Sequence, residues 1–210
     1  MSYSWVCWDV HGVTEIPTFG KTMEVLRGFR PISDETAAEY RKLGDDYAKG
    51  AATPEVFWSR VAHDFGPYAM ERARKYFLRI DPNRALWRAM PDLKKKYFMG
   101  IVSDSPGEKT VMIKNFLEER NPRTLDKNAN LFDDVFFSSD YGVTKTDGGL
   151  YKVVLEKYGG DPSRFLVVDD SKANIEEAAN LGMGTHLYRD VDSLLDALMP
   201  NRLTKKGIVG

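Results

Sequence analysis

The alternation of short apolar runs with helical patterns along the chain places the strongest limit on its fold. Runs typical of β-strands lie at residues 4–8, 98–102, 134–138, 165–168 and 184–188. They are apolar almost throughout, as in strands that are covered on both faces. From Phe98 onward each run is followed by a helical pattern or a short loop leading to one. This order predicts an α/β fold, with a parallel sheet between two layers of helices.

The interval between the first two strands carries more helix than a crossover requires. Residues 14–96 show helical patterns at 33–49, 53–65, 67–79 and 82–96, and no convincing strand. One helix is enough to connect parallel strands. We therefore expect a helical cap at residues 14–96, inserted over the carboxyl end of a sheet formed by residues 1–13 and 97–199, with a loose tail at 200–210.

Composition narrows the classes of partner. Lys and Arg number 30 and Asp and Glu 31, so the net charge of -1 gives no electrostatic case for nucleic acid or an anionic membrane. Cys7 is the only cysteine, which excludes an intramolecular disulfide and a cysteine-based zinc site. Asp9 comes too early for a signal peptide and no long apolar stretch follows, so we expect a cytoplasmic protein.

Polar residues stand where the expected strands end. Asp9 follows the first strand, Ser103 the second, Lys145 a loop after the third, and Asp169 and Asp170 the fourth. The carboxyl ends of parallel strands meet at one edge of a sheet, where ligands bind. Carboxylates there can hold Mg²⁺ or attack phosphorus, while a lysine and a hydroxyl can neutralise and orient phosphate oxygens. Each residue alone is typical of a turn or a surface, but together they indicate phosphoryl transfer.

Four motifs carry these residues: "DVHGV" at 9–13, "GIVSDSP" at 100–106, "GVTKTDGG" at 142–149 and "LVVDDSKANIEEAANLGM" at 166–183. With the segment "GAATPEVFWSRVAHDFG" at 50–66, they resemble the haloacid dehalogenase-like (HAD) superfamily, specifically its subfamily I phosphatases. The resemblance spans about residues 5–195. It implies a Rossmann-like core, a helical C1 cap inserted after the first strand, and a hydrolase that uses Mg²⁺ on a small phosphorylated metabolite.

The resemblance also implies roles for the metal ligands. Asp9 would be the nucleophile, forming an aspartyl-phosphate, and a ligand of Mg²⁺. The backbone carbonyl of His11 would be a second ligand and the Asp170 carboxylate a third. Asp169 would lie beside the metal as a secondary ligand, and Asn174 would support the site from behind these ligands.

Three further residues would bind the phosphoryl group in such an enzyme. Ser103 and the backbone N–H of Asp104 would hold its oxygens, and Lys145 would pair with both Asp9 and the phosphate. Family phosphatases usually have Asn at the position of Asp104. Its carboxylate would therefore either add negative charge near the phosphate or turn away to cap the following helix.

The larger departure is His11, because family phosphatases carry an Asp there as general acid and base. Three hypotheses follow. Imidazole, with an unperturbed pKa of about 6.5, could take over the proton transfers of a Mg²⁺-dependent phosphatase. The protein could instead be a weakened or silent relative kept for binding. It could also be a dehalogenase or another carbon-centred hydrolase, although the pair Asp169 and Asp170 suits a metal better.

Overall fold

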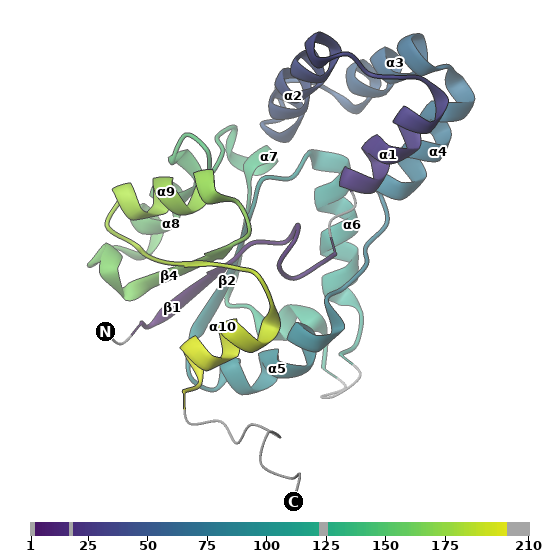
Figure 1. The fold of residues 1–210 in the computed structure, drawn as a ribbon. Coiled ribbons are helices and arrows are strands. Elements are labelled where there is room, and N and C mark those ends of the chain that lie inside the picture. The colour runs from purple at the N-terminus through teal and green to yellow at the C-terminus, as the bar shows by residue number, and fades with distance from the viewer. Residues whose placement is uncertain (1–2, 17–18, 122–125, 201–210) are drawn as a thin grey trace, which may run out of the picture.

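The computed structural model describes residues 3–16, 19–121 and 126–200 (Figure 1). Five parallel strands form one sheet in the order β3-β2-β1-β4-β5. Their bounds are β1 Trp5–Trp8, β2 Phe98–Ser103, β3 Asp134–Phe137, β4 Phe165–Asp169 and β5 Gly184–Leu187. The predicted parallel α/β fold is confirmed. Residues 201–210 of the predicted tail lie outside the described residues.

The register of the sheet brings the chemically interesting strand ends to the same level. Trp8, the last residue of β1, pairs with Ile101 of β2 and with Val168 of β4. The next residue or two of each strand therefore reach the same edge. This alignment places Asp9, Ser103 and Asp169 side by side across the three central strands.

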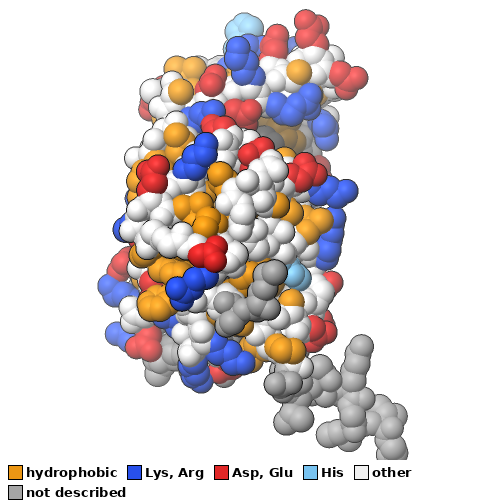
Figure 2. Space-filling view, turned by 90° about the vertical axis from the view of Figure 1, so that its left-hand side faces the viewer, with side chains coloured by type: hydrophobic (Ala, Val, Ile, Leu, Met, Phe, Trp, Pro, Cys, Tyr) orange, Lys and Arg blue, Asp and Glu red, His pale blue; other side chains and the backbone are white. Residues whose placement is uncertain are grey.

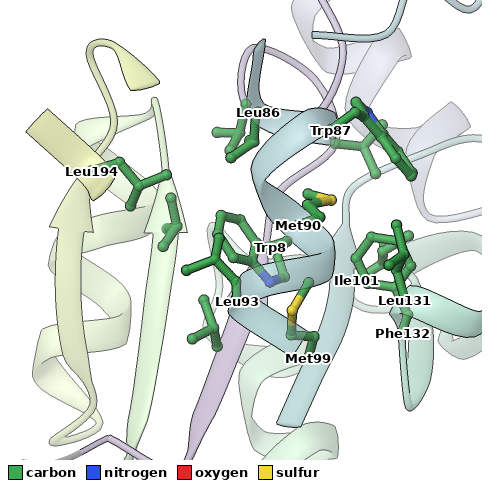
Figure 3. Close-up of a cluster of buried hydrophobic side chains, with 14 of the residues drawn as sticks. Trp8, Leu86, Trp87, Met90, Leu93, Met99, Ile101, Leu131, Phe132 and Leu194 are labelled. Atoms are coloured by element: carbon green, nitrogen blue, oxygen red, sulfur yellow. The ribbon is translucent and has the colours of Figure 1, made fainter. Parts of the chain in front are cut away.

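Helices cover both faces of the sheet. On one face lie α5 (Arg84–Lys94), α6 (Gly107–Glu118) and α10 (Val191–Leu198), whose apolar residues join Trp8 and Ile101 in one cluster (Figure 3). On the other lie α8 (Gly149–Tyr158) and α9 (Lys172–Asn180). Cys7 faces this second cluster, and burial raises the pKa of its thiol to about 12, so it stays protonated and unreactive at neutral pH.

We refer to the lobe of four helices at the top of Figure 1 as the cap. They are α1 (Phe19–Phe29), α2 (Asp34–Ala48), α3 (Pro54–Phe65) and α4 (Pro67–Phe77), and their buried residues make a third cluster rich in aromatic rings. Ser33 and Thr53 cap α2 and α3 through their hydroxyls. The sequence pattern did not predict α1, which has no acidic residue in its first turn and contains two glycines.

The helix α5 packs on the sheet, although the sequence-based division placed residues 14–96 in the cap. Leu86, Met90 and Leu93 lie in the same cluster as Trp8 (Figure 3). Burial of such a face stabilises the element it covers rather than a separate lobe. We therefore propose that the cap comprises α1 to α4 and that α5 belongs to the α/β core.

The remaining described elements are short: α7 (Ser138–Tyr141) and the 3₁₀ turns Asn128–Leu131 and Pro162–Arg164. Among the described residues, no helix is both long enough and apolar enough to cross a membrane. Positive and negative side chains are interspersed over the face seen in Figure 2, without a large patch of one sign. That distribution agrees with the balanced composition.

Candidate active site

The centre of the site is a buried lysine between two buried carboxylates. Asp9 follows β1 and is only 5 % exposed. The Nζ atom of Lys145 donates hydrogen bonds to Asp9 Oδ1 at 2.5 Å and to Asp169 Oδ2 at 2.7 Å. We call Asp9, Lys145 and Asp169 the carboxylate cluster. Three residues that are distant in sequence are thus joined at the edge of the sheet, as their motifs predicted.

The charges of this cluster do not balance. Burial would lower the pKa of Lys145, but Asp9 and Asp169 hold it well above its usual range, so the amine is charged at neutral pH. Burial raises the pKa of Asp9 to about 7, against the opposing effect of Lys145. One ammonium therefore does not keep Asp9 fully ionised at neutral pH. The cluster therefore has more acidic than basic groups, which favours the binding of a further cation.

Asp170 adds a third carboxylate at the same point. Oxygens of Asp9, Asp169 and Asp170 lie within 4.8 Å of one another, and Asp170 is exposed while the other two are buried. Burial and the neighbouring Asp169 raise the pKa of Asp170. Carboxylate oxygens from two strand ends, gathered at one negatively charged point, suit a hard divalent cation. The donor set present therefore fits a metal of the Mg²⁺ type.

Local hydrogen bonds fix how these acids are presented. Asp169 accepts from the backbone N–H of Ser171 at 2.9 Å and from Nδ2 of Asn174 at 3.1 Å, so Asn174 does stand behind the acids. Gly12, with φ of +89°, passes directly beside Asp170: a Cβ at residue 12 would lie 2.1 Å from Asp170 Oδ2. Only glycine permits both this backbone conformation and this approach.

The end of β2 brings Ser103 and Asp104 to the same edge. Ser103 is fully buried, and its Oγ has no hydrogen-bond partner among the described residues. The Asp104 carboxylate accepts from the backbone N–H of Lys145 at 3.0 Å and 3.2 Å. The alternative that Asp104 caps the next helix is wrong, because α6 begins after Pro106 without a side-chain cap. Asp104 instead fixes the loop that carries Lys145.

A second buried group of charges surrounds His11, and the sequence analysis missed two of its members. His11 Nδ1 lies 2.6 Å from Glu15 Oε1, and Lys109 Nζ lies 3.2 Å from the same oxygen. Glu15 is 3 % exposed and Lys109 fully buried. We call His11, Glu15 and Lys109 the histidine cluster. A tight turn explains it, since the backbone N–H of Glu15 bonds the carbonyl of Val10 at 2.8 Å and brings Glu15 back beside His11.

This contact has a consequence for the imidazole. With Nδ1 engaged by Glu15, the nitrogen left for other partners is Nε2. His11 lines a cavity of about 330 Å³ that lies between the cap and the core and also touches Asp104. A larger hollow of about 800 Å³ between α5 and α6 contains none of the predicted site residues. The smaller cavity is therefore the one that adjoins the chemistry.

Comparison with known proteins supports the family resemblance. A family model described as haloacid dehalogenase-like hydrolase matches residues 46–182. The chain is 26 % identical over 190 residues to bifunctional epoxide hydrolase 2 of Rattus norvegicus, covering 85 % of this chain and 30 % of that protein. The chain thus spans less than a third of the length of this relative.

Solved structures share the whole fold. A HAD family enzyme from Bacteroides thetaiotaomicron matches with a TM-score of 0.74 and 21 % identity, over 93 % of this chain and 99 % of that one. The same enzyme in complex with magnesium and inorganic phosphate matches with a TM-score of 0.68 and 22 % identity, over 92 % and 99 %. At this level of identity the likeness concerns the fold alone.

Proposed function

The chain belongs to the haloacid dehalogenase-like hydrolase family, and from this we propose that it is a Mg²⁺-dependent phosphatase acting on a small organic phosphomonoester. One observation supports this choice above the others. The carboxylate cluster together with Asp170 presents three acids to one buried lysine, with carboxylate oxygens within 4.8 Å of one another. A carbon-centred hydrolase has no use for this excess of negative charge, whereas a metal site does.

In this proposal, Asp9, Asp170 and the His11 carbonyl would hold Mg²⁺, with Asp169 beside them. When bound, the metal would neutralise negative charge on the phosphoryl oxygens and on the acids themselves. Lys145 carries a charge that the two carboxylates hold in place, so it can pair with the phosphate without moving. Ser103, whose hydroxyl lacks a partner among the described residues, and the backbone N–H of Asp104 would bind the remaining oxygens.

The chemical steps then belong to Asp9 and His11. An Asp9 carboxylate oxygen attacks phosphorus and forms an aspartyl-phosphate while the bond to the leaving oxygen breaks. Protonated His11 donates its Nε2 proton to that leaving oxygen, since its Nδ1 faces Glu15. Neutral His11 next takes a proton from water, which attacks the phosphorus and regenerates the Asp9 carboxylate.

The first experiment is a screen of phosphomonoesters with and without Mg²⁺. We expect hydrolysis that requires Mg²⁺ and that is abolished in Asp9→Asn, which keeps the shape of the side chain but removes the nucleophile. Asp92→Asn, which alters an acid that pairs with the exposed Lys95, is the matched control and should retain full activity. Equal turnover by Asp9→Asn and wild type would contradict the proposed nucleophile.

The metal site has its own test in solution. Calorimetric titration with Mg²⁺ should show binding to wild type and a strong loss of affinity in Asp170→Asn, because a direct carboxylate ligand is replaced by an amide. Unchanged affinity in this variant would show that the assigned ligands are wrong. Mg²⁺ binding without turnover would favour the silent, ligand-binding alternative, and turnover of a haloacid without Mg²⁺ would favour the carbon-centred one.

A further inference from the structure

The cavity of about 330 Å³ lies between the core and the cap, beside His11, the proposed acid and base. His11 and Asp104 line it from the core, and residues of α2, α3 and α4 line it from the cap. In Figure 1, α2 lies over the edge of the sheet near α7, which contacts it. The part of a substrate that leaves with the proton from His11 would enter this space. The residues that line the cavity therefore indicate which kind of leaving group it would bind.

The cap side of the cavity is a wall of aromatic rings. Tyr47 stacks on Phe57 with ring centroids 4.7 Å apart and an interplanar angle of 17°, and on Phe77 at 6.2 Å and 24°. All three line the cavity. Such stacked rings offer flat, apolar surfaces, which bind another ring in an offset or edge-on arrangement worth about 0.5–1.5 kcal/mol beyond its buried area.

The hydroxyl groups near this wall are already bonded within the protein. The hydroxyl of Tyr47 donates to Glu108 of α6, which also accepts from Trp58 Nε1 at 2.5 Å and from Arg74 at 2.8 Å. The hydroxyl of Tyr40, which also lines the cavity, donates to Asp64 at 3.0 Å. The two tyrosines thus present ring carbon to the cavity rather than a polar group.

Gly44 leaves space that the protein itself does not need. It lies inside α2 and lines the cavity, and a Cβ there would meet nothing within 4 Å. Glycine inside a helix costs about 1 kcal/mol relative to alanine. No close approach of the chain accounts for this cost. Gly28 on α1 is equally open, but only Gly44 faces the cavity, so a ligand there can lie directly against the backbone of α2.

Two opposite charges line the cavity on its cap side. Arg41 and Asp45 both line it, one turn apart on α2, and both are exposed. Opposite charges so close together do not favour an ionic leaving group of either sign. We propose that the cavity binds an uncharged, planar aromatic leaving group, so that the preferred substrate is an aryl phosphomonoester. This inference rests on the proposed phosphatase function.

The test compares 1-naphthyl phosphate with methyl phosphate as substrates, and measures the binding of 1-naphthol by NMR titration. Wild type should prefer the naphthyl ester in kcat/KM, and Gly44→Leu, which fills the cavity, should lower the naphthyl-to-methyl ratio by about tenfold or more. Gly28→Leu is the matched control: Gly28 is also helical and open, but it lies on α1 outside the cavity. Its ratio should equal that of wild type.

A naphthyl-to-methyl ratio that is the same in wild type and Gly44→Leu would overturn the inference, provided thermal unfolding shows that both are folded. If wild type hydrolyses neither ester and no other phosphomonoester in the screen, the proposed function fails, but the cavity is still tested by 1-naphthol. Binding to wild type and Gly28→Leu with loss in Gly44→Leu would uphold an aromatic site. No binding of 1-naphthol to wild type would overturn it.

Discussion

The carboxylate cluster and the histidine cluster each contain a buried lysine, but the pKa values of the two lysines are shifted in opposite directions. Burial opposes the charged form of both. Lys145 contacts two carboxylates, Asp9 and Asp169, and its pKa is raised well above the usual value. Lys109 pairs with Glu15, and its pKa is lowered. Asp9 and Asp169 together thus outweigh the burial of Lys145, whereas Glu15 does not outweigh the burial of Lys109.

This difference separates two tasks in the proposed mechanism. The carboxylate cluster keeps fixed charges in place, as the binding of a phosphate and a cation requires. In the histidine cluster, Glu15 is shared between Lys109 and the imidazole of His11. Glu15 thereby orients His11, whose proton must move during the reaction. In the proposed mechanism, the carboxylate cluster binds charged groups and the histidine cluster transfers protons.

Removing the lysine of the carboxylate cluster should have the largest effect. Lys145→Met leaves Asp9 and Asp169 buried without their shared partner, which typically costs about 3–5 kcal/mol of unfolding free energy. Loss of a charge that stabilises the transition state should also lower kcat by about 10²- to 10³-fold. Urea unfolding and phosphatase assays measure the two effects.

The matched control for this variant is Lys114→Met, which removes an exposed ion pair with Asp140. It should change the unfolding free energy by less than about 1 kcal/mol and leave kcat unchanged. If the two lysine variants proved equally stable and equally active, the carboxylate cluster would not be the electrostatic centre described here.

Within the histidine cluster, the imidazole should matter for activity more than for stability. His11→Ala should lower kcat by about 10²- to 10⁴-fold, and one limb of the pH–rate profile should disappear with it. Glu15→Gln keeps the size of the side chain and should cost less, because His11 remains but loses a charged partner. Activity on one activated phosphomonoester across a range of pH measures both variants.

His11→Asp distinguishes the phosphatase from the weakened relative. It restores the residue that is usual at this position in the family resemblance. Higher turnover in His11→Asp than in wild type, with little change in His11→Ala, would show that imidazole is a poor substitute and would support the weakened alternative. The two clusters would then differ in how much they contribute to stability, and not in how they contribute to catalysis.

The carboxylate cluster was predictable because each of its members directly follows a strand or its loop. Parallel strands align their carboxyl ends, so Asp9, Lys145 and Asp169 could be placed together from the order of apolar runs. Glu15 and Lys109 follow no such rule. The burial of Glu15 depends on the turn back to Val10, and that of Lys109 on the face that α6 presents to this turn. A glutamate four residues after His11 was the only available signal.

A similar limit applies to the helices. Those with clear caps and a single apolar face, such as α2 and α3, were predicted within a residue or so of their ends. For α5 the pattern indicated a helix but not the surface on which it packs, because an apolar face does not specify its partner. Its contact with Trp8 emerges only when the sheet is assembled.

The smallest effect should come from the lysine of the histidine cluster, and it should differ from that of Lys145 in its dependence on pH. Burial lowers the pKa of Lys109 below 10.5 in the folded chain. Between that lowered pKa and 10.5 the unfolded chain holds a proton that the folded chain has released, so stability rises with pH. Lys145, with a raised pKa, keeps its proton in the folded chain above 10.5, where stability therefore falls.

Lys109→Met should cost about 1–3 kcal/mol at neutral pH, because Glu15 and the Arg79 carbonyl lose a donor. Urea unfolding from neutral pH up to 10.5 should show wild type gaining stability relative to Lys109→Met. If the difference in unfolding free energy between wild type and Lys109→Met stayed constant or narrowed, Lys109 would be held in its charged state like Lys145. The two buried lysines would then not differ in the way argued above.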